Sequence, residues 1–120
     1  MILVDTSIWV DHLRNGDEAL VCELKNTMVL SHPFVVGELA LGKLSNRAEI
    51  LSLLNRLPQA GVASNSEVLH LVESQELMGC GIGLVDAHLL ASALLSRSTK
   101  LWTRDKKLQS VAVMLGLAHK

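Results

Sequence analysis

Short runs of aliphatic and β-branched residues recur along this chain, and residues typical of turns or helix starts follow them. The first run, Met1–Val4, contains no polar residue and ends at an acid, a pattern that favours a buried parallel strand. Similar runs predict strands at Met28–Leu30, Gly61–Ala63 and Lys100–Thr103, and a final edge strand at Gly116–Ala118. The pattern therefore predicts a sheet of four or five strands.

Between these runs, apolar residues return every three or four positions, which is the period of an α-helix. Pro33 stands where the first turn of a helix accepts proline, and Pro58 stands where a helix has to stop. The pattern predicts helices through Ile8–Leu13, Glu18–Lys25, Pro33–Gly42, Asn46–Leu57, Glu67–Leu77, Leu84–Leu95 and Asp105–Leu115.

Alternating strands and helices indicate an α/β sandwich, in which helices flank a mainly parallel sheet. The segment Leu84–Leu95 is apolar on nearly all sides, so we expect a central helix that packs on more than one face. No linker, repeat or low-complexity stretch interrupts the pattern, which predicts a single domain over residues 1–120.

Composition narrows the classes of function. The chain has 120 residues, of which 49% are hydrophobic, so it can bury a core and does not have the composition of a disordered segment. A net charge of −1 gives no strong basic surface for nucleic acid, and an aromatic content of 2% argues against a base-stacking platform. Any polyanion would have to be held by local Lys and Arg side chains or by a bound metal.

Neither targeting signals nor the cysteines point to a particular function. No apolar run approaches the roughly 18 residues that span a bilayer, and the first residues do not resemble a signal peptide. We therefore expect a cytoplasmic protein that does not enter a membrane. Cys22 and Cys80 form no CxxC motif and lie in apolar or glycine-rich surroundings, which predicts buried free thiols rather than a disulfide or a zinc site.

Four acidic residues, Asp5, Glu38, Asp86 and Asp105, stand in segments that are otherwise apolar. Asp5 and Asp105 each follow a predicted strand, where ligand sites of open α/β sheets collect. Glu38 projects from a largely apolar helical stripe, and Asp86 lies in the first turn of the central helix. A carboxylate that loses its hydration needs a partner, a metal or a shifted pKa, so we expect one shared site.

Each acid also has a simpler interpretation. Asp5 and Asp105 can be helix N-caps, Asp86 can serve the helix dipole, and Glu38 can lie in solvent beside its stripe. One shared cause explains all four more economically. Four converging negative charges repel one another unless cations occupy the site, and oxygen ligands without Cys or His spacing select Mg²⁺ or Mn²⁺ over zinc.

Such a site suits phosphodiester hydrolysis, because a carboxylate-held cation activates water and neutralises charge on phosphate oxygens. Ser7 and Thr103 can support a carboxylate or a metal-bound water, or can be ordinary cap hydroxyls. The backbone phosphates can be held by Arg14, Lys43, Arg47, Arg104, Lys106 and Lys107, although charged residues on a helix are more often a solvated face. The five histidines show no ligand spacing, and His88 is interpreted as structural.

Four motifs carry a resemblance to a known family. Val4-Asp5-Thr6-Ser7-Ile8-Trp9, Gly37-Glu38-Leu39, Val85-Asp86-Ala87-His88-Leu89-Leu90 and Leu101-Trp102-Thr103-Arg104-Asp105 resemble the four acidic motifs of PIN-domain ribonucleases. The length and the order of the motifs resemble the VapC toxins of bacterial toxin–antitoxin pairs. The ordered set of four is specific, whereas each motif alone is weak.

The resemblance implies a PIN-like three-layer sandwich and a metal-dependent endoribonuclease. Its metal, Mg²⁺ or Mn²⁺, would be held by Asp5, Glu38, Asp86 and Asp105, with Ser7 and Thr103 in support. It also implies an RNA substrate, a cognate antitoxin protein and a homodimer. Trp9, the helix Asn46–Leu57 and the helix Ser66–Leu77 can supply apolar surface for these partners, although core packing is the commoner role of such residues.

Two other classes of function compete with the nuclease. A response-regulator receiver would need a second acid beside Asp5 and an acceptor aspartate in the middle strand, yet Ala60–Asn65 contains none. A haloacid dehalogenase-type phosphatase would need an aspartate where Ser7 stands. A non-catalytic module that uses the acidic pocket for Mg²⁺ binding and partner signalling stays open at this point.

Overall fold

The computed structural model describes all 120 residues, and three parallel strands form its central sheet. They are β1 (Ile2–Val4), β2 (Val29–Leu30) and β3 (Lys100–Trp102), in the order β2-β1-β3. Leu3 pairs with Leu30 on one side and with Leu101 on the other. Every residue of β1 is buried, because the central strand of a parallel sheet is covered on both faces.

The predicted strand at Gly61–Ala63 is wrong. The chain pairs slightly earlier, through a single bridge between Gln59 and Ser31. Pro58 has no N–H to extend this pairing, and Val62 is 55% exposed, so no covered strand forms here. The hydrophobic pattern of three small and branched residues was too short to place the pairing.

The predicted edge strand at Gly116–Ala118 is reduced to one bridge, between Ala118 and Leu101. Gly116 turns the chain with a φ of 72°, and only the residues after it reach the edge of β3. The sheet thus has three strands extended by two bridges, instead of four or five strands. The predicted class, an α/β fold with a parallel sheet flanked by helices, is confirmed.

Seven helices accompany the sheet, in the places that the hydrophobic period predicts. Their bounds are α1 (Thr6–Asn15), α2 (Glu18–Lys25), α3 (Pro33–Leu41), α4 (Arg47–Arg56), α5 (Asn65–Ser74), α6 (Leu84–Leu95) and α7 (Lys106–Met114).

Short-range capping sets most helix boundaries. The Asp17 side chain accepts from the Leu20 N–H at the start of α2. Ser64 and Glu67 form a reciprocal capping box at the start of α5. That helix ends earlier than predicted, because Glu76 adopts a left-handed conformation with a φ of 52°.

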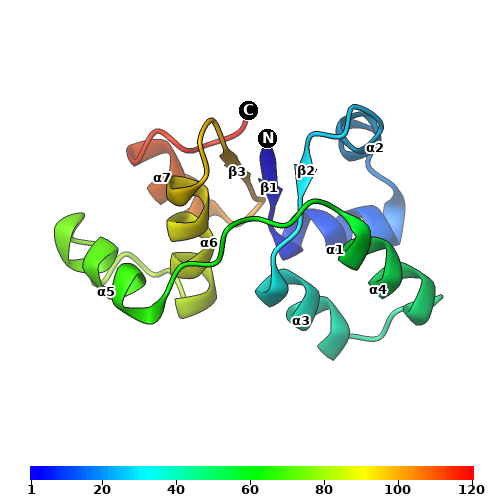
Figure 1. Cartoon of the computed structure of the whole chain (residues 1–120), viewed down its shortest axis with the longest axis horizontal. Helices are drawn as coiled ribbons and strands as arrows, with labels where there is room; N and C mark the ends of the chain where they lie inside the picture. The colour runs from blue at the N-terminus through cyan, green and yellow to red at the C-terminus, as the bar shows by residue number, and fades with distance from the viewer.

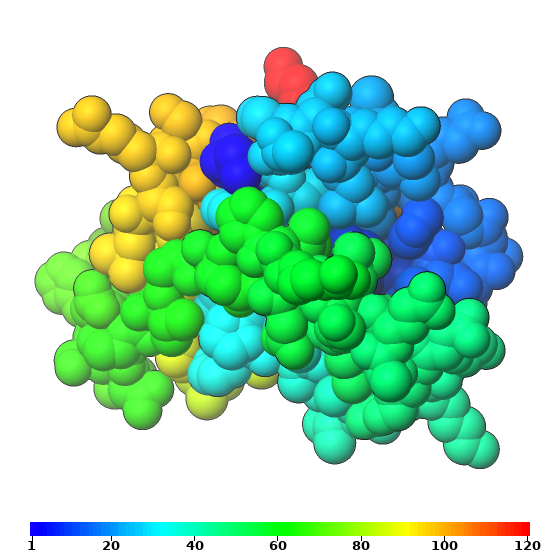
Figure 2. Space-filling model, turned by 45° about the vertical axis from the view of Figure 1, so that its right-hand side comes forward, coloured from blue at the N-terminus to red at the C-terminus, as the bar shows by residue number.

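The helices fall into two groups around the sheet. Figure 1 shows α5, α6 and α7 on one side and α1, α2, α3 and α4 on the other. The segment between α4 and α5 crosses from one group to the other, and Figure 2 shows it as a green band across the front of the molecule. No helix is both long enough and apolar enough to cross a bilayer.

Burial follows the predicted pattern in α6 and departs from it elsewhere. The seven residues Ala87–Ala93 of α6 are all buried, so the predicted central helix is confirmed. Trp9 is only 2% exposed and belongs to the core, so it supplies no partner surface.

The predicted burial of the cysteines is wrong, because Cys22 lies on the outer side of α2 and Cys80 in the glycine-rich loop before α6; both are exposed free thiols.

The sheet also fixes where the candidate site lies. Because all three strands are parallel, their carboxyl ends share one edge, which is the lower edge of the sheet in Figure 1. Chain segments leaving that edge lead into α1, α3 and α7, and α6 starts beside it. The predicted acids lie in these segments.

Candidate active site

Asp5 ends β1 and is 6% exposed, which makes it the most buried acid of the four. Its Oδ2 accepts hydrogen bonds from Ser7 Oγ at 2.8 Å and from Thr103 Oγ1 at 2.7 Å. The side chain makes no capping hydrogen bond to α1, although Asp5 occupies the N-cap position. The cap interpretation of Asp5 is therefore wrong, and its carboxylate is held by two hydroxyls instead.

Ser7 and Thr103 connect the two ends of the chain at this point. Their hydroxyl oxygens lie 3.3 Å apart, and each also accepts a backbone N–H: Ser7 Oγ from Arg104 and Thr103 Oγ1 from Asp105, both at 3.0 Å. Each hydroxyl thus donates to Asp5 and accepts from the loop between β3 and α7. This network orients the buried carboxylate and fixes the loop that carries Asp105.

Asp105 is exposed and caps α7, since its Oδ1 accepts from the Leu108 N–H at 2.9 Å. The cap interpretation is correct for this residue. It does not exclude a second role, because Oδ2 has no protein donor. A cap bond to one oxygen holds the other in a defined direction at the carboxyl edge of β3.

Asp86 is half-buried at the start of α6, and its Oδ2 accepts from the Gly83 N–H at 3.0 Å. Burial is the largest cause that raises the pKa of Asp86, and the Gly83 N–H acts in the opposite direction. The negative charges of Asp5, Asp105 and Glu38 raise this pKa further. Asp86 therefore lies close enough to the other three predicted acids for their charges to affect its pKa.

Glu38 does not lie in the core, so its predicted burial is wrong. The residue is exposed on α3, and two apolar neighbours on its stripe are exposed as well, Phe34 to 37% and Leu41 to 91%. The apolar stripe of α3 is therefore not a core face at this point. Glu38 Oε1 accepts a 2.6 Å hydrogen bond from Thr6 Oγ1, which ties α3 to the start of α1.

The donor set suits a hard divalent cation. Each of the four carboxylates has one oxygen held by a hydrogen bond and a second oxygen without a protein donor. Oxygen ligands of this kind fit Mg²⁺ or Mn²⁺ better than zinc. Even so, no three His, Cys, Asp or Glu side chains form a closed metal-binding group. Instead, Glu38 is hydrogen-bonded to Thr6, and Asp86 and Asp105 accept from backbone amides at the starts of α6 and α7.

Comparison with known proteins gives the same assignment as the motifs. The family model described as "PIN domain" matches residues 2–114. The chain belongs to the PIN-domain family. Ribonuclease VapC32 of Mycobacterium tuberculosis, in strains CDC 1551 / Oshkosh and ATCC 25618 / H37Rv, is 47% identical over 118 residues, 98% of this chain and 95% of that protein. The resemblance to VapC-type ribonucleases is thereby confirmed, and PIN nucleases generally depend on divalent metals. The receiver and phosphatase alternatives do not fit this family.

The basic residues around this PIN domain site are not equivalent. Arg104 is paired with Asp11 and Asp17, and Arg47 donates to the Ala40 and Gly42 carbonyls at the end of α3. These two arginines are occupied within the protein.

Lysines near the site have no such partners. Lys43, Lys106 and Lys107 are exposed and form no salt bridge. The Lys107 side chain packs against Gly81, in the loop that leads to Asp86. A Cβ atom added to Gly81 would lie only 2.7 Å from Lys107 Cδ. Lys43 and Arg14 line a cavity of about 420 Å³ that also contains Glu38. The predicted phosphate contacts thus flank the acids on two sides.

Two histidines of the PIN domain, His32 and His88, lie in the core. His32 is fully buried, and its Nδ1 accepts from the Phe34 N–H while its Nε2 lies 3.0 Å from Ser92 Oγ. Because Nδ1 accepts, the neutral ring carries its proton on Nε2 and donates to Ser92. His88 is 3% exposed and contacts the edge of Phe34, which agrees with the structural role predicted for it.

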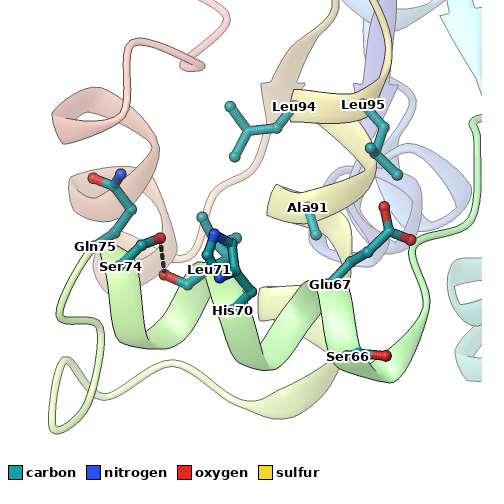
Figure 3. A pocket seen from close by; sticks show the side chains of 9 residues that line it. All are labelled: Ser66, Glu67, His70, Leu71, Ser74, Gln75, Ala91, Leu94 and Leu95. Carbon is teal, nitrogen blue, oxygen red and sulfur yellow. Dashed lines mark hydrogen bonds between the residues drawn. The ribbon is translucent and has the colours of Figure 1, made fainter.

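Another cavity, of about 450 Å³, lies away from the acids, between α5 and α6. Figure 3 shows polar side chains from α5, including Glu67 and His70, facing Ala91, Leu94 and Leu95 from α6. None of the four acids lines this cavity. Of the two cavities, only the smaller one is lined by a predicted acid, Glu38.

Sequence reasoning missed three residues at this edge, namely Thr6, Asp11 and Asp17. Thr6 was overlooked between two candidate residues, although its position at the start of α1 puts it beside α3. Asp11 follows Ser7 by four residues and so shares its helical face, which is a signal that the sequence does contain. Nothing local in the sequence connects Asp17 with Arg104.

Proposed function

We propose that this protein is an endoribonuclease that hydrolyses RNA phosphodiester bonds with Mg²⁺ or Mn²⁺, and that residues 1–120 form one PIN-like domain. The main support is the position of four acidic residues at or beside the carboxyl edge of the sheet, where the charges of Asp5, Asp105 and Glu38 help to raise the pKa of Asp86, in a chain 47% identical to a ribonuclease. A metal-dependent nuclease needs several oxygen ligands near one another. The fold by itself would not indicate this function, because one fold can serve many functions.

Residues Asp5, Glu38, Asp86 and Asp105 would hold the cation through the oxygens that lack protein donors. A divalent cation bound there supplies an activated water and offsets the charge on the phosphate. The protein's own contribution is orientation: Ser7 and Thr103 hold Asp5 from one side, and Thr6 holds Glu38. These hydroxyls remove rotational freedom from the two carboxylates before substrate arrives.

The basic side chains would place the RNA backbone across the acids. Arg14 and Lys43 lie on the Glu38 side, and Lys106 and Lys107 lie on α7 beyond Asp105. With a net charge of −1, the chain cannot attract RNA through its overall field, so these local cations have to do so. The substrate is thus held at its phosphates rather than by stacked bases.

We also propose that the protein is the toxin of a type II toxin–antitoxin pair, forms a homodimer, and is blocked by a cognate antitoxin protein. Its 47% identity to Ribonuclease VapC32 supports the toxin assignment. Exposed leucines on α4 and α5, Leu53 at 45% and Leu69 at 62%, provide apolar surface for such contacts.

The decisive experiment is incubation of purified protein with total cellular RNA, with Mg²⁺, with Mn²⁺ and with chelator, followed by mapping of new RNA ends. Asp5→Asn and Asp86→Asn should each lower cleavage by about two orders of magnitude or more, because each removes a ligand charge. Glu73→Gln, an exposed acid on α5, is the matched control and should cleave like wild type.

Weak cleavage that is the same in Asp5→Asn and Asp86→Asn protein is the level of a contaminating nuclease. Cleavage by both of these variants at the rate of wild type and of Glu73→Gln would contradict the proposal. For the toxin assignment, expression alone should stop growth, and co-expression with the adjacent gene's product should restore it. Harmless expression of a protein that cleaves RNA in vitro would contradict the toxin role only.

A further inference from the structure

Arg104 forms ion pairs with two carboxylates at once. Its Nε lies 2.5 Å from Asp11 Oδ2, and its Nη2 donates to Asp17 Oδ2. These are the only two salt bridges in the structure, and both involve the same guanidinium group. Arginine is suited to this because its planar fork offers donors along two edges, whereas a lysine ammonium is a single point charge.

The three residues come from separate elements. Asp11 lies on α1, Asp17 caps α2, and Arg104 lies on the loop between β3 and α7. The Asp17 side chain is 12% exposed, whereas the side chains of Arg104 and Asp11 are 41% and 46% exposed, so only the Asp17 end of the bridge is shielded from water. The Asp11–Arg104–Asp17 bridge therefore joins the α1–α2 corner to a loop almost ninety residues later in the sequence.

The backbone at Arg104 belongs to the candidate site. Its N–H donates to Ser7 Oγ, and its neighbours are Thr103, which holds Asp5, and Asp105, one of the four acids. The loop is thus attached to α1 twice, through its backbone at Ser7 and through the Arg104 side chain at Asp11. A shift of this loop would move Thr103 and Asp105 together.

We propose that Arg104 is a positioning residue, and that the Asp11–Arg104–Asp17 bridge holds the loop so that Thr103 orients Asp5 and Asp105 reaches the metal. The proposal rests on the proposed function, since it concerns the same site. It assigns a role to Asp11 and Asp17, which lie outside the four acidic motifs. It also replaces the predicted role of Arg104 as an RNA contact.

Charge supports the positioning role over phosphate binding. Two carboxylates already satisfy the guanidinium, so an RNA phosphate would have to displace them and leave two negative charges beside a negative backbone. The pair also keeps the pKa of Asp17 low, with the Arg104 hydrogen bond as the largest cause. Nearby Lys106 and Lys107 have no acidic partners and are better placed to take the phosphates.

Four variants and one control separate the two roles. Asp17→Asn keeps an N-cap residue for α2 while it removes the charge, and Asp11→Asn removes the other charge. Arg104→Ala removes the bridge, and Arg104→Lys can reach only one carboxylate at a time. Arg97→Ala is the matched control, because Arg97 is an exposed arginine on the loop before β3 and forms no salt bridge.

Three measurements apply to each variant. Hydrogen exchange of the Arg104 and Asp105 backbone amides in metal-free protein reports how firmly the loop is held. RNA cleavage as a function of Mn²⁺ and of RNA reports kcat, KM and the Mn²⁺ concentration for half-maximal rate. Calorimetric titration with Mn²⁺ alone gives the metal affinity without any turnover.

The positioning role predicts that Arg104→Ala and the Asp11→Asn/Asp17→Asn double variant behave alike. In both, the two amides should exchange faster, Mn²⁺ affinity and kcat should fall by about ten-fold or more, and KM for RNA should change little. A triple variant that combines Arg104→Ala with both aspartate substitutions should show no larger effects than either parent, since both parents break the same bridge. Arg104→Lys should recover part of the loss, and Arg97→Ala should match wild type.

The opposite result is equally distinct. If Arg104 binds phosphate, Arg104→Ala should raise KM and leave the amides and the Mn²⁺ affinity unchanged, while the double aspartate variant should bind RNA more tightly. That outcome would overturn the positioning role and leave the nuclease function intact. If wild-type protein cleaves no RNA, the proposed function fails, and the exchange and Mn²⁺ titrations still decide whether the bridge holds the loop.

Discussion

Thr103 Oγ1 donates a 2.7 Å hydrogen bond to Asp5 Oδ2, and this contact joins residues 98 positions apart in the sequence. Thr103 is 7% exposed and Asp5 is 6% exposed, so neither group is well hydrated. The same hydroxyl oxygen accepts the Asp105 N–H. One buried hydroxyl therefore connects the first acid of the chain with the last, and several expectations follow from its position.

Replacing Thr103 by valine keeps the shape of the side chain and removes the hydroxyl. It leaves a buried carboxylate oxygen with one donor fewer and an amide without its acceptor, so we expect a loss of about 1–3 kcal/mol in the free energy of unfolding. Chemical denaturation measures this loss. Thr103→Ser retains the hydroxyl and should lose much less; equal losses in both variants would mean that packing, not the hydrogen bonds, is what matters here.

Asp86 should destabilise the metal-free protein at neutral pH. Its pKa is raised in the folded state, so the folded protein holds this proton more tightly than the unfolded chain, and stability falls as pH rises from 3.8 through the folded pKa. Asp86→Asn removes that penalty and should raise the Tm in chelator at pH 7. The same variant should lose most of the Tm increase that Mg²⁺ or Mn²⁺ produces in wild type.

That prediction fails if Asp86→Asn lowers the Tm in chelator while wild type and variant respond equally to metal. Glu18→Gln is a suitable control, since Glu18 is an exposed acid at the start of α2 and is not one of the four acids of the site. It should change neither the metal-free Tm nor the response to metal.

His32 should make the protein sensitive to mild acid. Burial is the largest cause that lowers its pKa from 6.5, and the charge of His88 adds to it, so the folded protein binds this proton less readily than the unfolded chain. Stability is then complete above about pH 6.5 and falls as pH drops toward the folded pKa, by at most about 1.4 kcal/mol per pH unit.

Denaturant unfolding between pH 5 and pH 8 tests this slope. His32→Asn keeps a residue that can cap α3 but does not titrate, so it should flatten the dependence even if it lowers stability at every pH. His70→Asn, on the exposed face of α5, should leave the slope unchanged. A slope that survives in His32→Asn would assign the acid sensitivity to another group.

Local signals explain why most of the fold could be predicted. Helix starts such as Ser64 with Glu67 and Asp17 with Leu20 depend on residues within one turn, so they are readable in the sequence. The strand at Gly61–Ala63 failed because its pairing depends on where Ser31 lies in three dimensions. A strand of two or three residues is too short for its hydrophobic pattern to predict where it pairs.

The candidate site divides in the same way. Positions at strand ends and in first turns predicted that Asp5, Asp86 and Asp105 lie at one edge of the sheet, since parallel strands bring their carboxyl ends together. Glu38 was placed correctly on α3, but its burial was not, because the period of a helix cannot show that Phe34 and Leu41 face solvent. The ion pairs of Arg104 with Asp11 and Asp17 could not be predicted, because these partners lie 93 and 87 residues away in the sequence.

Lys106 and Lys107 provide the test of how RNA is held. If these exposed lysines on α7 contact backbone phosphates, replacing both by alanine should raise KM several-fold with little change in kcat, since they act on binding and not on the reacting bond. The salt dependence of RNA binding should also weaken, by about 0.7 in the slope of log K against log salt for each lost contact.

Lys25→Ala, an exposed lysine at the end of α2, controls for the loss of one positive charge and should leave KM and the salt slope at their wild-type values. Lys43→Ala tests the cavity beside Glu38 in the same assay. If the α7 double variant keeps the wild-type slope while Lys43→Ala reduces it, the RNA approaches from the Glu38 side. In that case the phosphates bind over α1 and α3, and the lysines of α7 remain a solvated face of their helix.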